Sequence, residues 1–490
     1  MRYLILFIGL SVSAADWPTY RADASRSGVT SEQLAMPLKQ AWVHQPLHAP
    51  RPAWRGPAKI DPYNNVGKLK NRQLFDHAFH VIADAKHVYF GSSADDQVHC
   101  LDLNSGEERW SFFTEGPVRF APTLHDGRLF VGSDDGHAYC ISTAGKLIWK
   151  KLLAPRDYRI AGNNRIISAW PLRTGILIRD GIAYAGAGMF PKEMVHLVAF
   201  DSVNGKVERW RNEQDIWPAQ GYLLLSESRV YVPTGRSNPV VYDRNTGKSI
   251  EENSNINDRF TLIKWEEDKP VKMPNPRQKG RIFGLIPDKN KDSYATFTGN
   301  HMIVYGGKSY LHVSNELHVL DRVRYLTLER NYKEADDKKK NLGAEATKLN
   351  GVRKALEKQL DKLIEQKKSK SLPGLEKLIE EKRAQIKSQE KLLSEKESQI
   401  TATRKIIVKI ISDIKSCLLW RVPCNQSDSL ILAGDTLFAG GDNEIVAYAA
   451  NDGKKVWSAP VNGAAMGIAV AHGRLLVSTN KGTIHCFRAK

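Results

Sequence analysis

Residues 121–149 read APTLHDGRLFVGSDDGHAYCISTAGKLIW and contain four short apolar runs separated by turn signals. The dipeptides Asp126-Gly127 and Asp135-Gly136 suit tight turns between antiparallel strands. Within the runs, apolar residues alternate with others at the period of two that is typical of strands. The stretch therefore predicts four successive strands, the last of which ends in a tryptophan.

The same pattern recurs along most of the chain. Residues 80–110 read HVIADAKHVYFGSSADDQVHCLDLNSGEERW and align with the first stretch strand by strand. Shorter matches follow at residues 176–210, 222–250, 301–320, 429–457 and 467–488. Repeats of about 40 residues with four short strands are typical of the blades of a β-propeller. We therefore expect an all-β propeller of seven blades, or of eight if residues 255–298, where the pattern is poor, form another.

A tryptophan closes the fourth strand of most units. The residues at this position are Trp42, Trp110, Trp149, Trp210, Trp420 and Trp457. One large aromatic side chain per blade, at a fixed strand position, buries a large apolar area between neighbouring blades. We therefore interpret these tryptophans as structural residues and not as an aromatic platform for a ligand.

The last unit, residues 467–488, lacks its fourth strand. Residues 38–43, LKQAWV, have the strand character and the tryptophan of the missing piece. A propeller can close when its last blade takes a strand from the other end of the chain, and this hides the sheet edge from other chains. We therefore expect the N-terminal strand to close the ring.

Residues 325–416 interrupt the unit that begins near residue 301, between its third and fourth strands. They are rich in Lys, Glu, Leu and Ile, and their apolar residues recur at the three- and four-residue steps of a coiled coil. Residues 371–374, SLPG, form a clear helix breaker near the middle. We expect an antiparallel helical hairpin inserted into a propeller made of residues 16–324 and 417–490. The pattern leaves open whether this arm is only solvated or binds a partner or a second copy of the chain.

The first fifteen residues have the features of a secretory signal peptide. Arg2 precedes an apolar run, and small residues lead to a cut after Ala14 or Ala15. The run is too short to span a bilayer, and no cysteine follows the cut to take a lipid. We expect an exported, periplasmic protein with no transmembrane span.

The net charge of +18 is spread over many segments, so we expect a solvated surface and no nucleic-acid partner.

The repeat, with its glycine turn and closing tryptophan, resembles that of the PQQ-binding-like propeller superfamily. The sequence LFVGSDDGHAYCISTAGKLIW at residues 129–149 carries this likeness. The superfamily includes quinoprotein alcohol dehydrogenases and a non-catalytic propeller lipoprotein of the outer-membrane barrel assembly machinery. The opening DWPTYRADASRSGVT, residues 16–30, and much of residues 51–123 resemble exported PQQ-like repeat proteins of planctomycete-type bacteria. The resemblance is specific for fold and weak for activity.

For function, the resemblance implies two classes of protein, an enzyme and a binding scaffold. A quinoprotein dehydrogenase holds PQQ and Ca²⁺ beside a carboxylate base and a disulfide of adjacent cysteines. None of the five cysteines here neighbours another, and no motif assigns a base. We expect a non-catalytic scaffold with no cofactor and with protein partners in the cell envelope. The alternatives are a PQQ- and calcium-dependent dehydrogenase and a cell-envelope polysaccharide binder.

Loops between the units supply the candidates for a ligand-contacting face, because such loops line propeller faces. The candidates are Asp76, His77, His80, Asn163, Asn164, Arg165 and Arg236. Three of them fall within residues 76–80, which is a weak signal for a metal, so no metal site is predicted. The acidic stretches 93–96 and 133–136 are expected to be turns and not Ca²⁺ sites, because each offers few ligands.

Overall fold

The computed structural model describes residues 15–54, 60–61, 66–67, 74–162, 164–234, 239–250, 260–261, 281–285, 294–298, 300–369 and 373–490. Residues 1–14, which hold most of the predicted signal peptide, lie outside the described residues. The chain divides into two compact units. The β unit comprises residues 1–319 and 420–490, and the helical unit comprises residues 320–419.

The β unit is built from small sheets whose strands mostly follow one another in the sequence. The first sheet contains β5 (Val81–Ala83), β6 (His87–Gly91), β7 (Gln97–Asp102) and β8 (Glu108–Phe113), and the second contains β9 (Thr123–His125), β10 (Arg128–Gly132), β11 (His137–Ser142) and β12 (Leu147–Leu152). The third sheet contains β15 (Leu177–Arg179), β16 (Ile182–Ala187), β17 (Val195–Asp201) and β18 (Glu208–Gln214). The fourth contains β19 (Leu224–Leu225), β20 (Arg229–Val232) and β21 (Val240–Asp243). The later sheets contain β22 (Phe260–Thr261), β23 (Arg281–Leu285) and β24 (Tyr294–Thr298); and β25 (His301–Tyr305), β26 (Lys308–Val313), β27 (Glu316–Asp321) and β28 (Leu418–Pro423). Two small hairpins are β3 (Ile60–Asp61) with β4 (Val66–Gly67), and β13 (Arg159–Gly162) with β14 (Arg165–Ser168).

A seven-stranded set combines strands from the N-terminal and C-terminal parts of the chain. Its strands lie in the order β1 (Val29–Thr30), β29 (Ser429–Ala433), β30 (Thr436–Ala449), β31 (Lys455–Ala471), β32 (Arg474–Thr479), β33 (Ile484–Ala489) and β2 (Leu38–His44). Irregularities in the pairing of β30 and β31 divide these long strands, so that the first half of β31 pairs with β30 and the second half with β32. The set therefore contains two four-stranded repeat units. In the second unit, β2 is the outer strand, antiparallel to β33, and places Trp42 opposite Cys486.

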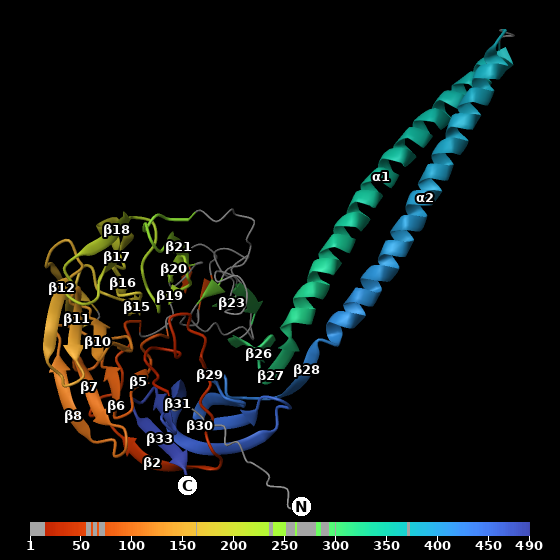
Figure 1. Ribbon diagram of the computed structural model, residues 1–490. Helices are drawn as coiled ribbons and strands as arrows, with labels where there is room; N and C mark the ends of the chain where they lie inside the picture. The colour runs from red at the N-terminus through yellow and green to blue at the C-terminus, as the bar shows by residue number, and fades with distance from the viewer. Residues whose placement is uncertain are drawn as a thin grey trace, which may run out of the picture. The chain divides into compact units, whose positions relative to one another are not determined.

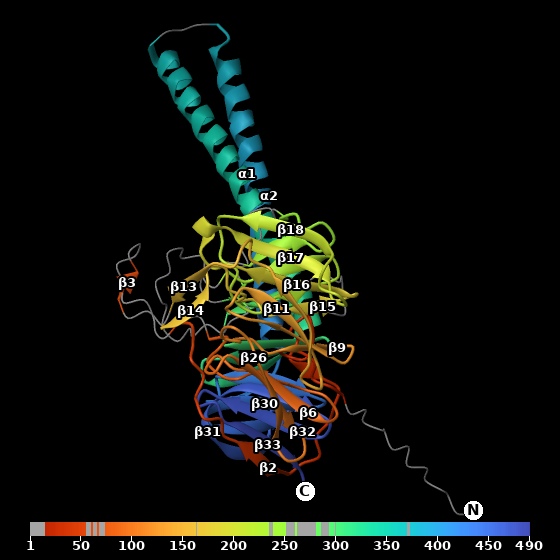
Figure 2. The same ribbon diagram turned by 90° about the vertical axis from the view of Figure 1, so that its left-hand side faces the viewer.

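Figure 1 shows β5 and β15, the first strands of two four-stranded sheets, toward the middle of the β unit, and β8 and β18, the fourth strands, at its rim. Figure 2 shows one such sheet, with β15 to β18 stacked in sequence order. In the first two sheets the two middle strands are buried along nearly their whole length, whereas the fourth is largely exposed or half-buried. The middle strands are therefore continuous apolar runs, because other sheets cover both of their faces.

The core lies between neighbouring sheets. One buried cluster, for example, joins Tyr89 and Cys100 of the first sheet to Leu129 and Ile141 of the second. All five cysteines are buried and unpaired. The expectation of a mostly β protein is confirmed, and the stretch 255–298, where the repeat is poor, contributes strands β22 to β24.

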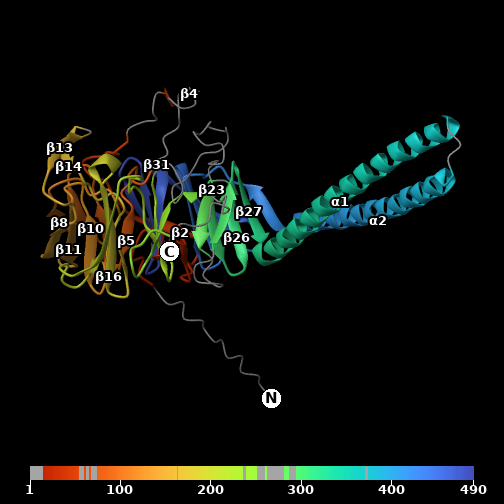
Figure 3. The same ribbon diagram turned by 90° about the horizontal axis from the view of Figure 1, so that it is seen from above.

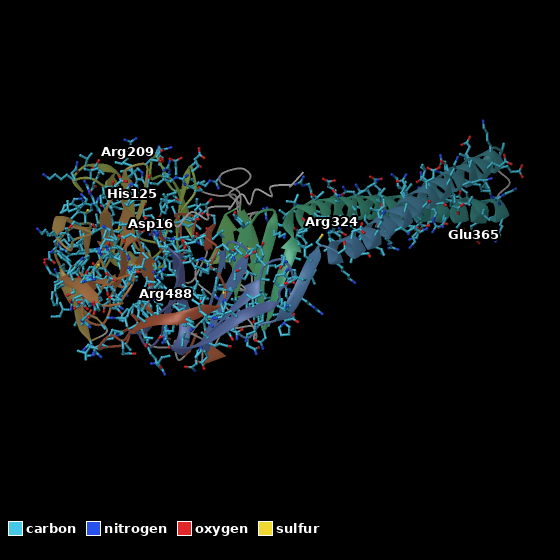
Figure 4. All side chains as sticks on the ribbon, turned by 60° about the horizontal axis from the view of Figure 1, so that its bottom comes forward. Asp16, His125, Arg209, Arg324, Glu365 and Arg488 are labelled. Atoms are coloured by element: carbon cyan, nitrogen blue, oxygen red, sulfur yellow. The ribbon has the colours of Figure 1, made fainter. Side chains whose placement is uncertain are left out.

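The helical unit contains two long antiparallel helices, α1 (Arg322–Ser369) and α2 (Leu375–Lys415), which lie side by side (Figure 3). They are inserted between β27 and β28. Gly374, whose φ is +94°, precedes α2 and allows the chain to reverse. Charged side chains cover both helices, and Figure 4 labels Arg324 and Glu365 toward the two ends of α1. Neither helix in the described residues has an apolar stretch of the length that a bilayer crossing requires.

Candidate functional site

Six tryptophans connect consecutive repeat units by hydrogen bonds. In each case the indole Nε1 donates to a backbone oxygen of the next repeat unit, at 2.9 to 3.3 Å. The pairs are Trp42 with Leu103, Trp110 with Thr143, Trp149 with Ser202, Trp210 with Arg244, Trp420 with Ala450, and Trp457 with Leu38. These six are the residues that the repeat placed at the end of the fourth strand. They lie between sheets and are therefore positioned as structural side chains.

Five of these tryptophans, all except Trp457, lie against a glycine of the neighbouring repeat unit. A Cβ atom on Gly106 would meet the ring of Trp42 at 2.5 Å, and one on Gly247 would meet Trp210 at 2.4 Å. Both glycines also have positive φ, +74° and +68°. Glycine is therefore required at this position for two reasons, the backbone conformation and the close approach of the indole ring.

Residues 15–34, here called the N-terminal loop, lie along the inner strands of several sheets. Trp17 forms a β-bridge with Ala83 of β5. The carbonyl oxygens of Pro18 and Ala24 then accept hydrogen bonds from backbone amides of β9 and β19, at 2.7 and 2.9 Å. Farther on, β1 pairs in parallel with β29. Red segments of this part of the chain cross the middle of the β unit in Figure 1. One continuous segment therefore contacts four separate sheets.

An aromatic cluster forms where the N-terminal loop meets the inner strands. Tyr20 stacks on Tyr222 with ring centroids 3.8 Å apart, and His80 meets Tyr20 edge-on at 4.8 Å. The guanidinium of Arg26 lies 5.2 Å from the centroid of the Tyr222 ring. Burial lowers the pKa of His80 to about 4 and that of Arg26 to about 10. His80 is therefore neutral at physiological pH and packs as an aromatic ring.

A second cluster consists of four buried charged residues, Asp76, Arg119, Asp134 and Arg173. Arg119 donates to Asp76 at 2.8 Å and to Asp134 at 2.6 Å. Arg173 donates to both oxygens of Asp134, at 3.0 and 2.9 Å. Burial opposes ionisation of Asp134, but the two arginines hold its pKa below the usual range. We call this set the Arg-Asp cluster; its two positive and two negative charges balance.

Residues 51–54 are attached to the Arg-Asp cluster. The amide of Ala53 donates to Asp76 at 2.7 Å, and Arg119 donates to the carbonyl oxygen of Arg51 at 2.8 Å. The indole of Trp54 donates to the side-chain oxygen of Gln220 at 3.0 Å. Within the described residues, Asp76 Oδ1 has no hydrogen-bond partner. The cluster therefore orders this segment and retains one unused acceptor.

A family model described as outer membrane protein assembly factor BamB matches residues 51–169 and 411–490. Among solved structures, the quinohemoprotein alcohol dehydrogenase ADHIIG from Pseudomonas putida HK5 is similar with a TM-score of 0.51 at 11% identity, over 97% of this chain and 81% of that chain. The repeat match in these two segments and the likeness in fold support a PQQ-like β-propeller repeat protein.

Two further structures are similar to this propeller repeat protein. They are a computationally designed protein, Ika8, with a TM-score of 0.46, 8% identity and coverage of 85% and 97% of the two chains, and BamB from Moraxella catarrhalis, with a TM-score of 0.35, 9% identity and coverage of 93% and 98%. Among curated proteins, no sequence matches the chain. The likeness to ADHIIG concerns the fold alone, and activity must be argued from the residues.

The predicted face residues of this propeller repeat protein fall into separate places. Asp76 belongs to the Arg-Asp cluster, and His80 to the aromatic cluster. Arg165 donates to both carboxylate oxygens of Asp96, at 2.8 and 2.7 Å. The other predicted residues are His77, which is half-buried, Asn164, which is exposed in the turn between β13 and β14, and Asn163 and Arg236, which lie outside the described residues. The structure therefore brings Asp76 together with arginines that the sequence reasoning did not select.

Arg119 and Arg173 were missed although the repeat carries a signal for them. Both stand at the same point of the repeat, shortly before the first strands β9 and β15. The acidic stretches that contain Asp96 and Asp134 are turns, as expected, but their carboxylates also bind arginines. Comparing charged residues at equivalent repeat positions would have pointed to these pairs.

The described residues do not fit a PQQ-calcium site. Every cysteine is a free thiol, so the described chain has no ring disulfide. In the described part of the chain, no three His, Cys, Asp or Glu side chains gather in a way that could hold a metal ion. The buried acids Asp76 and Asp134 both accept hydrogen bonds from arginines, which occupy their carboxylates and hold the pKa of Asp134 below its usual range. No redox step through that cofactor follows from these residues.

Proposed function

We propose that this protein is an exported, non-catalytic scaffold, built on a closed eight-bladed propeller, that binds protein partners in the cell envelope. The Arg-Asp cluster carries the proposal. A dehydrogenase of this fold needs a carboxylate free to take a proton from its substrate. Here the buried carboxylates of Asp76 and Asp134 face Arg119 and Arg173 at 2.6 to 2.9 Å, which favours a structural role.

Eight blades are supported by the count of repeat units when β22 to β24 are included. Closure is supported at the junction of the two chain ends. There Trp457 donates to Leu38 of β2, and Trp42 of β2 donates to Leu103 of the first sheet. Six of the eight units are thus fixed to the next by a buried or half-buried tryptophan, which suits a rigid platform better than a moving active site.

The helical unit supplies the partner-binding arm of the proposed scaffold. Its helices contact one another, yet several large apolar side chains remain exposed. They are Val352, Leu378, Leu392, Ile406, Val408 and Ile411, and the exposed fraction of Val408 reaches 66%. Exposed apolar side chains among lysines and glutamates on a long helix are typical of surfaces that bind another helix.

Two experiments test the proposal. Titration of the purified protein with PQQ and Ca²⁺ should give neither stoichiometric binding nor oxidation of alcohols or sugars, and tight binding with turnover would establish the dehydrogenase alternative.

Capture from envelope fractions should retain proteins on the full chain but not on a chain lacking residues 325–416. A Val408→Ser variant should weaken this capture, and the neighbouring Lys409→Ser should not. Retention of polysaccharide by both chains would favour the carbohydrate-binding alternative.

A further inference from the structure

Glu32 is a buried carboxylate at the end of the N-terminal loop. Its exposed fraction is 2%. It accepts hydrogen bonds from three backbone amides, those of Ala15 at 3.1 Å, His472 at 3.0 Å and Gly473. Among the described residues, no Lys, Arg or His side chain forms an ion pair with it; the ring of His472 instead binds Asp16, which Figure 4 labels. A buried carboxylate that is paired only with neutral donors lacks the counter-charge such groups usually have.

The two ends of the N-terminal loop meet at this carboxylate. Ala15 begins the loop and Glu32 lies near its end, and both are held against the turn between β31 and β32 by His472 and Gly473. The nitrogen of Ala15 is therefore already placed where a positive charge would neutralise Glu32. In an uncut chain this nitrogen belongs to a peptide bond and carries no charge.

We propose that the bond between Ala14 and Ala15 is a processing site, and that the α-ammonium group it releases on Ala15 is the ion-pair partner of Glu32. This inference rests on the export proposed above. A signal-peptidase-class endopeptidase would add water across the bond, leaving a carboxylate on Ala14 and an amine on Ala15. An α-amine has an ordinary pKa of about 7.7–8.0, so it takes a proton at neutral pH. Of the two cuts that the sequence allows, a cut after Ala15 would remove this nitrogen.

The ion pair gives processing a structural consequence. Before the cut, Glu32 is buried without a counter-charge, and the N-terminal loop is held less strongly. After the cut, a charge-assisted contact joins the start of the loop to its end and to the β31–β32 turn. The mature chain is therefore more stable than its precursor, and the final fixing of the loop follows removal of the leader.

The position of the cut is tested by the intact mass and N-terminal sequence of the exported protein. The proposal expects a chain that begins at Ala15. A chain that begins at Asp16 would overturn it and leave export standing. A chain that keeps residues 1–14 and stays in the cytoplasm would overturn both the inference and the proposed export.

The ion pair is tested separately with chains of residues 15–490 that carry either a free or an acetylated Ala15 amine. Acetylation should lower the midpoint of thermal unfolding by about 2–5 °C. Glu32→Gln should lower it by a similar amount in the free form and by much less in the acetylated form, because the two changes remove one interaction. The control is Asp16→Asn, whose exposed carboxylate should contribute equally to both forms. Equal effects of Glu32→Gln in both forms, or no effect of acetylation on the unsubstituted chain, would overturn the pair.

Discussion

The indole Nε1 of Trp42 donates a hydrogen bond to the carbonyl oxygen of Leu103 at 3.0 Å, across 61 residues of sequence. Trp42 belongs to β2, the outer strand of the unit that contains β33, and Leu103 follows β7 in the first sheet. One side chain therefore connects the sheet that holds the C-terminal strand to the sheet that begins the repeat. The ring of Trp42 also covers Gly106, so this junction depends on a single glycine.

The first prediction concerns that glycine. Gly106→Ala should lower the free energy of unfolding by roughly 2–3 kcal/mol, because the new Cβ would meet the Trp42 ring and the backbone has positive φ. Gly127→Ala is the matched control: its φ is +67° but nothing lies within 4 Å of the added atom. It should cost about 1 kcal/mol. Urea unfolding followed by tryptophan fluorescence measures both, and equal losses would show that the indole contact contributes nothing.

The second prediction concerns the Arg-Asp cluster. Arg119→Met should destabilise the β unit by about 3–5 kcal/mol, because it leaves Asp76 without its cation and Asp134 with one arginine in place of two. Arg109→Met removes an arginine that pairs with Asp102 at the surface, and it should leave the unfolding midpoint unchanged. Denaturant unfolding of the two variants checks this. Similar small losses in both would mean that the cluster is not a stabilising network.

Local sequence signals were sufficient for the strands. Turn dipeptides and period-two alternation act within a few residues, so the repeat predicted strands such as β10 and β11 and their hairpin. The two packed helices were also predicted, because their apolar spacing extends over many turns. The stretch 255–298 lacks clear alternation, which is why the repeat alone left the number of blades at seven or eight.

Contacts between distant parts of the chain could not be predicted from such local patterns. Arg21, for example, donates to the carbonyl oxygen of Leu430, 409 residues away. Nothing in residues 16–30 shows such a contact, because hydrogen bonds to backbone oxygens leave no trace in the partner's side chain. The Arg-Asp cluster is an intermediate case, since Arg119 and Arg173 share a repeat position but Asp76 does not share one with Asp134.

The third prediction concerns pH. Burial lowers the pKa of His80 to about 4 in the folded protein, whereas an unfolded histidine titrates near 6.5. Between these values the unfolded chain binds a proton that the folded chain excludes, so stability is lost as the pH falls. His80→Gln cannot take up that proton. Between pH 7 and pH 4 the unsubstituted protein should therefore lose more unfolding free energy than the variant, by on the order of 3 kcal/mol.

Denaturant unfolding at several pH values measures this difference. His125→Gln, at a position where the side chain is 36% exposed, serves as the control for replacing a histidine with glutamine. Parallel curves for His80→Gln and the unsubstituted protein would contradict the burial of a neutral imidazole against Tyr20.

The last prediction concerns the separability of the helical unit. At its base the amide of Asp321 donates to the carbonyl oxygen of Cys417 at 2.9 Å, and β27 and β28 are neighbours in one sheet. Replacing Arg322–Ser416 with Asn-Gly should therefore convert the insertion into a β-hairpin, because this dipeptide suits a two-residue turn between Asp321 and Cys417. Because the ends of β27 and β28 are adjacent, closing either the helical insertion or the short turn costs little conformational entropy. The helical signal in circular dichroism should disappear, the strand signal should remain, and the unfolding midpoint should change by less than about 5 °C.

A hairpin shortened by two heptads in each arm is the matched control, because it preserves the base of the insertion and the phase of the helices. It should fold like the full chain and lose capture only of partners that bind toward the tip. If the Asn-Gly variant fails to fold while the shortened hairpin folds, the helices are part of the stability of the β unit and not a separable arm. If both fold and both retain every captured protein, the partner-binding surface lies on the β unit, and the exposed apolar side chains of α1 and α2 need another explanation.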